Sequence, residues 1–328
     1  MAGPHPAVAA VRTALSRLLD EAEPAGHLTT GAVAVACSGG ADSLALAAAA
    51  THVARHRRLT VHGLVVDHRL QPGSAEVAAR TATQLRALGF DSVRVIEVEV
   101  TGPGGIEAAA RRARYAALDG ARPPGALVLL GHTLDDQAET VLLGLGRGSG
   151  PRSVAGMRPL DPPWARPLLG LRRETTTAAC AALGLRPWVD PHNADPRFTR
   201  VRLRTEVLPL LEEVLRGGVA EALARTAAQL REDCDALDRL ATDLTERVRV
   251  DEELDAAALG AAPAALRRRV LRRWLGFRGV SGLTDHHLRR IDALMGSWRG
   301  QGGVALPGGL VVRRTHGRLQ VDRPQHRG

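Results

Sequence analysis

The chain has 328 residues, a hydrophobic content of 45% and a formal net charge of +9, which suffice for two domains with buried cores. Its 44 basic residues are all arginine, so the positive charge persists at any ordinary pH and favours a polyanionic partner such as nucleic acid. The absence of lysine excludes chemistry that needs a lysine amine, including Schiff-base and pyridoxal-phosphate mechanisms.

Strand-like and helix-like segments alternate in the first part of the chain. The strand-like runs cover residues 32–37, 60–67, 93–100 and 126–131, and the helix-like segments cover about 43–56, 74–89, 106–119 and 134–145. This alternation predicts an α/β fold with a parallel sheet of βα units. The run Leu127-Val128-Leu129-Leu130 is continuously apolar, as expected where helices cover both faces of the sheet.

Prolines mark a change in the pattern, with four of them in residues 158–167, which we expect to form loops rather than strands. Helical spacing follows at residues 205–215, 219–248 and 263–275, and short apolar runs at 304–306, 310–312 and 319–321 close the chain. We therefore expect a smaller, mainly helical second domain that ends in a small sheet. The predicted boundary divides the chain into residues 1–214 and 215–328.

The three cysteines, Cys37, Cys180 and Cys234, form no Cys-x-x-Cys pair, which argues against a zinc ribbon, an iron–sulfur cluster or a disulfide scaffold. No stretch reaches the roughly 20 apolar residues that span a bilayer, and the N-terminus shows no secretory signal pattern. We expect a cytoplasmic protein without membrane association. No protein partner is implied, and the sequence leaves open whether the chain forms a homodimer.

The first predicted strand leads into a glycine-rich turn at the start of a helix. The turn consists of Ser38, Gly39, Gly40, Ala41, Asp42 and Ser43. Glycines let the backbone approach an anion, and a helix N-terminus offers unpaired N–H groups and a positive dipole end. The loop is not a Walker A motif, which requires lysine. Taken alone, it is equally compatible with a phosphate site and with a tight turn of any α/β protein.

A second group of polar residues follows the fourth predicted strand. It contains His132, Asp135, Asp136 and Glu139. The carboxyl edge of a parallel sheet gathers ligands, and carboxylates beside a phosphate loop can hold Mg²⁺ or attract an ammonium group. One of these acidic residues could instead serve only the helix dipole.

Other candidate residues are supported by their expected position near the same carboxyl edge of the sheet. They are Asp67 and His68 after the second strand, Glu107, Arg111 and Arg114 along one helical face, and Arg200 and Arg204 near the domain junction. Capping, a salt-bridged helix face and a solvated helix entry are the structural alternatives for these three groups. The arginines could equally neutralise polyphosphate or RNA.

These motifs together resemble a known family. The turn from Ser38 to Ser43 is similar to the pyrophosphate loop of the N-type ATP pyrophosphatases, or PP-loop superfamily. The other motifs are similar to those of the tRNA(Ile)-lysidine synthetase family: Val66 to His68, Glu107 to Tyr115, Gly131 to Thr140, Arg147 to Gly150, Asp190 to Asn193, and Arg200 to Arg204. The resemblance covers about residues 30–210.

The resemblance implies a Rossmann-like catalytic domain that uses ATP and Mg²⁺. ATP would adenylate the 2-carbonyl of the wobble cytosine in CAU-anticodon tRNA(Ile) and release pyrophosphate, and the ε-amine of free L-lysine would then displace AMP. It implies catalytic roles for Asp136, His132 and Asp42, a pyrophosphate site at residues 38–43, and Mg²⁺ at Asp42 or Asp136. The remaining candidates above would bind substrate, and residues 215–328 would contact tRNA.

Two positions depart from the family pattern. Val201 stands where an asparagine is expected, and Arg69 follows Asp67-His68 where glycine is usual. Both leave the neighbouring polar residues intact, so they affect local contacts more than the reaction. The alternatives are an ATP-dependent tRNA thiolase of the same superfamily, which would need reactive thiols, and a non-catalytic basic RNA-binding protein, which would not need the carboxylates.

Overall fold

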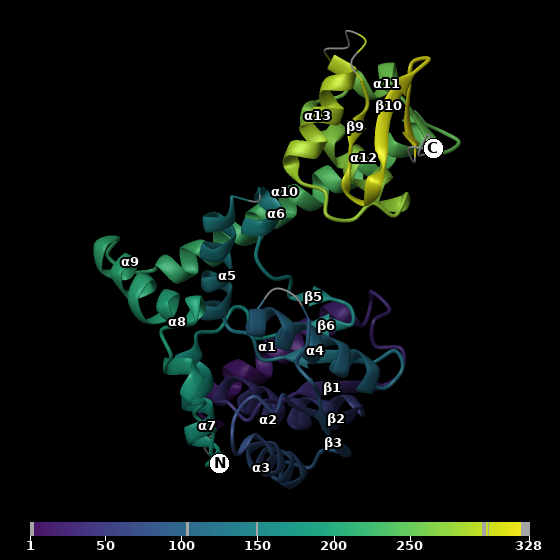
Figure 1. The fold of residues 1–328 in the computed structure, drawn as a ribbon. Coiled ribbons are helices and arrows are strands. Elements are labelled where there is room, and N and C mark those ends of the chain that lie inside the picture. The colour runs from purple at the N-terminus through teal and green to yellow at the C-terminus, as the bar shows by residue number, and fades with distance from the viewer. Residues whose placement is uncertain (1–2, 103–104, 149, 297–299, 301, 323–328) are drawn as a thin grey trace. The chain divides into compact units, whose positions relative to one another are not determined.

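The computed structural model describes residues 3–102, 105–148, 150–296, 300 and 302–322 (Figure 1). The chain divides into two compact units, one of residues 1–147 and 156–227 and the other of residues 148–155 and 228–328. Within the described ranges, every helix is too short or too polar to cross a membrane.

The first unit contains a six-stranded sheet in the order β3-β2-β1-β4-β6-β5. Its strands are β1 (Ala32–Ala36), β2 (Thr60–Asp67), β3 (Ser92–Glu97), β4 (Leu127–Leu130), β5 (Leu160–Asp161) and β6 (Trp164–Ala165). All neighbours pair in parallel except β5 with β6. The four strands expected from the apolar runs are confirmed. The expectation of loops throughout residues 158–167 was wrong, because β5 and β6 lie there; two-residue strands are too short to leave a periodic pattern.

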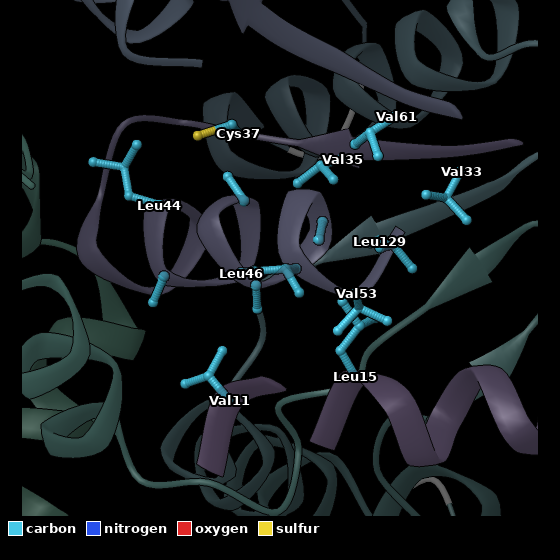
Figure 2. Close-up of a cluster of buried hydrophobic side chains, with 14 of the residues drawn as sticks. Val11, Leu15, Val33, Val35, Cys37, Leu44, Leu46, Val53, Val61 and Leu129 are labelled. Atoms are coloured by element: carbon cyan, nitrogen blue, oxygen red, sulfur yellow. The ribbon is translucent and has the colours of Figure 1, made fainter. Parts of the chain in front are cut away.

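Helices cover both faces of this sheet. On one face, α1 (Pro6–Ala22), α2 (Ala41–Arg57), α3 (Ser74–Ala87) and α7 (Arg173–Ala182) share a core with Val33, Val35, Leu127 and Leu129 (Figure 2). On the other face, α4 (Gly105–Ala121) packs on the alternate strand residues Ala34, Val128 and Leu130. Because α2 is buried on most of its surface, its alanine-rich sequence shows almost no polar face.

Further helical segments complete the described part of the first unit. They are α5 (Leu134–Arg147), η1 (Pro191–Ala194), α8 (Thr199–Arg202), α9 (Leu208–Val214) and the first turns of α10 (Val219–Val248). A π-helical turn, η2 (Leu203–Val207), joins α8 to α9, so helical backbone begins at residue 199 rather than at the expected 205. Leu134 and Ala138 of α5 pack against Leu208 and Ala220.

The second unit is mainly helical and contains a small antiparallel sheet, as expected. Its helices are α6 (Pro151–Val154), the rest of α10, α11 (Ala256–Gly260), α12 (Ala264–Phe277), α13 (Asp285–Gly296) and η3 (Pro307–Gly309). The strands are β7 (Arg249–Val250), β8 (Glu253–Asp255), β9 (Val304–Ala305), β10 (Val311–Thr315) and β11 (Arg318–Asp322), in the order β7-β8-β11-β10-β9. A separate core of aliphatic side chains with Trp274 holds these elements together.

Candidate active site

The carboxyl ends of four adjacent parallel strands define the candidate site. In the sheet order, β2 ends at Asp67, β1 leads into Ser38, β4 is followed by His132, and β6 is followed by Arg166. Parallel strands bring their carboxyl ends to one edge, where open α/β sheets bind ligands. The fold therefore gathers polar residues that lie about 100 positions apart in the sequence.

The glycine-rich turn is held by its own side chains. The Ser38 N–H donates to Ser43 Oγ at 3.2 Å, and Ser43 Oγ donates to the Gly40 carbonyl at 3.0 Å. Gly39 has φ +86°, and a Cβ there would lie 2.4 Å from Thr81 Oγ1, so a larger residue would not fit. Gly40 provides no side-chain cap to α2, which leaves first-turn N–H groups available to an anion.

A close backbone approach joins this turn to the acidic motif. A Cβ on Gly131 would lie 3.0 Å from the Asp42 carbonyl carbon and from the Ser43 nitrogen. Only glycine lets the end of β4 pack this closely against the first turn of α2. The motif that begins at His132 is thereby placed next to Asp42.

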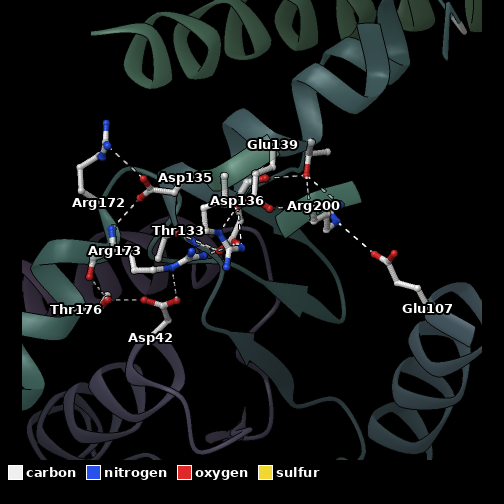
Figure 3. Close-up of polar contacts among 12 residues, drawn as sticks. Asp42, Glu107, Thr133, Asp135, Asp136, Glu139, Arg172, Arg173, Thr176 and Arg200 are labelled. Carbon is white, nitrogen blue, oxygen red and sulfur yellow. Dashed lines mark hydrogen bonds and ion pairs between the residues drawn. The ribbon is translucent and has the colours of Figure 1, made fainter. Parts of the chain in front are cut away.

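Arg173, at the start of α7, links the two carboxylates that the sequence assigned to catalysis (Figure 3). Its Nε lies 3.2 Å from Asp42 Oδ2, and its Nη2 lies 2.7 Å from Asp136 Oδ1. Asp42 also accepts a hydrogen bond from Thr176, and Asp136 Oδ2 accepts one from the Thr133 N–H at 2.8 Å. One guanidinium thus lies between both acids, and Arg204 Nη2 adds a second cationic contact, 3.7 Å from Asp136 Oδ1.

The two carboxylates have different proton affinities. Burial raises the pKa of Asp42 despite the hydrogen bond from Thr176 and the charge of Arg173. Burial also opposes ionisation of Asp136, but Arg173 and the Thr133 N–H outweigh it and hold the pKa of Asp136 below its usual value. Asp136 is therefore the carboxylate that stays ionised most readily.

The other two acids of the motif pair with different arginines. Asp135 lies 3.2 Å from Arg172 Nη2 and accepts the Arg173 N–H at 2.8 Å, so it also caps α7. The Glu139 side chain is fully buried, and its oxygens lie 3.4 Å from Arg200 and 2.8 Å from Arg204. Arg200, in α8, and Arg204, in the π-helical turn, are four residues apart, so both reach Glu139 from one side of the helical segment.

Glu107 and the junction motif complete this part of the site. Glu107 Oε1 lies 3.7 Å from Arg200 Nε, which connects α4 to the arginine pair. Gln71 Nε2 lies 3.0 Å from Asp190 Oδ1 and 2.6 Å from His192 Nδ1. Ser149 and the side chain of Asn193, which also belong to the family-like motifs, lie outside the described residues.

A basic cluster surrounds the ends of β2 and β4. Arg114 Nε donates to His68 Nε2 at 3.2 Å, and Arg111 Nη2 donates to Tyr115 Oη at 3.2 Å. Burial lowers the pKa of His132 to about 4; Asp136 opposes this shift, and Arg166 and Arg111 add to it. His132 is consequently a neutral imidazole at ordinary pH.

Buried polar atoms without a hydrogen-bond partner are concentrated at this edge of the sheet. In the described ranges they are Arg12 Nε, His68 Nδ1, His132 Nδ1 and Arg166 Nε, of which the last three lie at this sheet edge. Arg166 is only 6% exposed and donates to the Arg158 carbonyl at 2.9 Å, yet no carboxylate in the described part of the chain pairs with it. A buried guanidinium without a counter-ion is costly, which is typical of an anion-binding residue.

Four residues of this site were not anticipated from the sequence. They are Arg166, Arg172, Arg173 and Thr176. The pair Arg172-Arg173 begins a short helix, which is an ordinary solvated pattern in an arginine-rich chain. Only the tertiary fold shows that these side chains face the carboxylates of α2 and α5.

The positive φ of Arg69 explains why glycine is usual there and leads to a stability prediction. Arg69 has φ +53°, its N–H donates to Asp67 Oδ1 at 2.9 Å, and its exposed side chain pairs with Glu97. We expect Arg69→Gly to raise the free energy of unfolding by about 0.5–1 kcal/mol. Relief of the left-handed backbone strain should stabilise the protein by more than the loss of the exposed ion pair with Glu97 destabilises it. Urea unfolding measures this change. Arg69→Ala, which removes the pair but keeps the strain, should show no gain; an equal gain would contradict the explanation.

The low pKa of His132 predicts how stability depends on pH. An unfolded histidine protonates near its ordinary value of 6.5 and the folded one near 4, so the unfolded state binds more protons in this interval. Stability should therefore fall as the pH drops from about 6.5 towards 4. Between pH 7 and pH 5, we expect the wild type to lose about 1 kcal/mol more than His132→Asn, because His132 keeps some solvent access. If the free energy of unfolding changed with pH in the same way in both proteins, the low pKa assigned to His132 would be refuted.

Comparison with known proteins first defines the class. A PP-loop domain model matches residues 10–211, which contain the glycine-rich turn and the carboxylates described above. A U34-tRNA thiolase from Methanococcus maripaludis with its 4Fe-4S cluster has a similar fold, with a TM-score of 0.51 and 16% identity over 61% of this chain and 72% of that chain. The fold and site therefore define an ATP-using protein of the PP-loop class.

The family follows from relatives that match almost the whole chain. A TilS substrate binding domain model matches residues 254–320. The tRNA(Ile)-lysidine synthases of Rhodococcus jostii (strain RHA1) and Nocardia farcinica (strain IFM 10152) are 58% and 59% identical to the chain, covering 97% and 96% of it and 96% of each relative. The chain belongs to the tRNA(Ile)-lysidine synthase family.

Proposed function

We propose that this chain ligates free L-lysine to the 2-carbonyl carbon of the wobble cytidine in CAU-anticodon tRNA(Ile), in the cytoplasm, at the expense of ATP. The observation that carries the proposal is the joining of the phosphate-type turn to the acidic motif: Gly131 places Asp136 beside Asp42, and Arg173 bridges them. Family membership supports the same reaction.

The first step would be adenylation of the cytosine oxygen with release of pyrophosphate. The first-turn N–H groups of α2 and the hydroxyls of Ser38 and Ser43 would bind the pyrophosphate, and Arg166 would neutralise negative charge on the phosphoryl group that is transferred to the base. Such groups act mainly by electrostatic stabilisation in a site already arranged for it.

Magnesium would accompany the nucleotide. Asp42 and Asp136 form a carboxylate pair around one cationic group, and Mg²⁺ is typically held by one or two carboxylates together with substrate phosphates. When bound, the ion would neutralise phosphate charge and add to the positive charge that Arg173 and Arg204 bring to the two acids. Arg173 would release at least one of these carboxylates as the ion binds.

The second step would require a neutral lysine amine. Asp136, whose pKa lies below its usual value, and neutral His132 are the candidate proton acceptors. The acids Asp135 and Glu139 would attract the incoming ammonium group, while Arg200 and Arg204 would receive the carboxylate of lysine or the RNA backbone. Asp67, His68, Glu107, Arg111 and Arg114 would border the reacting base.

Residues 215–328 would contact the tRNA. This assignment rests on the substrate binding domain model over residues 254–320 and on the arginine-rich composition of the chain.

Thiolation is the second candidate, because the fold is shared with a tRNA thiolase. The three cysteines, Cys37, Cys180 and Cys234, are all buried. Burial raises the pKa of Cys180 to about 11, which leaves almost no reactive thiolate at neutral pH. The site therefore favours an amine as the nucleophile over sulfur.

An experiment on the two half-reactions tests the proposed order. With tRNA and ATP but no lysine, the protein should release pyrophosphate and leave AMP attached to the tRNA. Addition of lysine should then release that AMP. Pyrophosphate release that requires a sulfur donor, or that occurs without tRNA, would refute the proposal.

A further inference from the structure

The helix α12 carries a basic sequence whose role lies outside the site described above. Between residues 264 and 278 there are six arginines and no acidic residue. Several of these arginines have local partners: Arg267 binds Asp292 at 2.6 Å, and Arg269 binds Asp238 at 2.9 Å. At the end of the helix, Arg278 pairs with Glu252, whereas Arg273 lies over the ring of Phe277.

Phe277 is unusual for this chain because it exposes an aromatic ring. Its side chain is 70% exposed, although the protein contains only eight aromatic residues. Trp274, one turn earlier, is 3% exposed and belongs to the core, so the fold does not need Phe277 for packing. Arg273 covers one side of the ring, with its Cζ 5.1 Å from the ring centroid.

A cavity of about 650 Å³ opens beside this ring. Phe277 and Arg278 border it together with Ser281, Pro307 and Leu310 of the same unit. Its walls combine an aromatic ring, an aliphatic surface, a hydroxyl and a guanidinium. A planar, polar ring linked to a phosphate matches this combination better than an aliphatic side chain does.

We infer that Phe277 and Arg273 form a stacking site for an unpaired nucleotide of the tRNA outside the reacting wobble position. This inference rests on the proposed function. The base would stack on the free face of Phe277 and enter the cavity, and Arg273 would lie near its phosphates, whereas Arg278 is already paired with Glu252. Base stacking on an aromatic side chain is not selective for sequence, whereas a lone arginine patch would bind duplex and single strand alike.

Affinity measurements with matched variants test the site. We expect Phe277→Ala to weaken binding of full-length CAU-anticodon tRNA(Ile) about 5- to 100-fold, and Phe277→Tyr to stay within about threefold of the wild type. Leu240→Ala, which removes another exposed apolar side chain (52% exposed) from α10, should bind normally. The salt dependence should be unchanged in Phe277→Ala and reduced in Arg273→Ala, because only the arginine displaces counter-ions. Equal binding by Phe277→Ala and wild type, or equal losses in the alanine and tyrosine variants, would overturn the inference.

A second pair of measurements separates this inference from the proposed reaction. Phe277→Ala should raise the KM for tRNA in the lysine ligation assay by the same factor. Normal ligation with an unchanged KM would refute the stacking site alone, whereas Phe277-dependent tRNA binding without ligation would refute the reaction alone. A photo-crosslinking benzoylphenylalanine at position 277 should attach to an unpaired nucleotide; attachment only to duplex stem or to protein would overturn the inference.

Discussion

Replacement of Asp42 with alanine is expected to abolish ATP-dependent pyrophosphate release, by about 1,000-fold or more, while tRNA binding stays within about twofold of the wild type. Asp42 lies in the first turn of α2, next to the proposed pyrophosphate site, and shares Arg173 with Asp136. Its removal would eliminate a charge that the nucleotide and its metal ion require. Pyrophosphate release and tRNA affinity, measured on the same preparation, check this result.

A matched variant separates charge from structure at this position. Asp42→Asn keeps a side chain of the same shape and one oxygen that can accept the hydrogen bond from Thr176, while its amide group replaces the oxygen that accepts from Arg173. If the carboxylate acts chemically, the asparagine variant should be nearly as inactive as the alanine variant but as stable as the wild type. Near-normal activity in Asp42→Asn, or an equal loss of tRNA binding and pyrophosphate release in Asp42→Ala, would show that the residue supports the fold instead.

Arg166→Met is expected to lower the ligation rate about 100- to 1,000-fold without lowering the free energy of unfolding by more than about 1 kcal/mol. We expect activity to fall while stability is kept because Arg166 is buried beside His132 with no carboxylate partner in the described residues. A linear apolar side chain removes an uncompensated charge at the cost of one hydrogen bond to the Arg158 carbonyl. Initial rates at saturating substrates and urea unfolding provide the two readings.

Arg267 is the control for this prediction because its guanidinium is also mostly buried but binds Asp292 through two hydrogen bonds, of 2.6 and 3.0 Å. Arg267→Met should leave Asp292 without its partner and lower the free energy of unfolding by about 1–3 kcal/mol, with little effect on the ligation rate. The assignment of Arg166 to the site would be wrong if Arg166→Met behaved like Arg267→Met.

Much of the fold could be predicted from the sequence because its long elements leave clear periodic patterns. The strands β1, β2 and β4 and the helices α2, α5 and α10 lie within a few residues of the expected ranges. The short strands could not be predicted in this way. With two or three residues each, β5 to β8 are too short to show an alternation of apolar and polar residues. They are strands because of the strands they pair with, not because of their own composition.

The same distinction explains what the sequence revealed about the site. The glycine-rich turn and the acidic motif are contiguous in sequence, so their chemistry could be recognised directly. Arg173, in contrast, contacts Asp42, which lies 131 residues away in the sequence. Arg166 follows the short strand β6, which could not be predicted within the proline-rich segment. Their partners are set by the order of strands in the sheet and by the packing of α7 on α2, which local patterns do not encode.

Mass analysis of the wobble nucleoside tests the central claim most directly. CAU-anticodon tRNA(Ile) would be incubated with the protein, ATP, Mg²⁺ and isotope-labelled L-lysine, then digested to nucleosides. We predict one labelled lysine joined to the wobble cytidine, formed with equal amounts of AMP and pyrophosphate and absent when ATP is omitted. An unmodified cytidine, or a nucleoside that gains sulfur instead of lysine, would contradict the assignment.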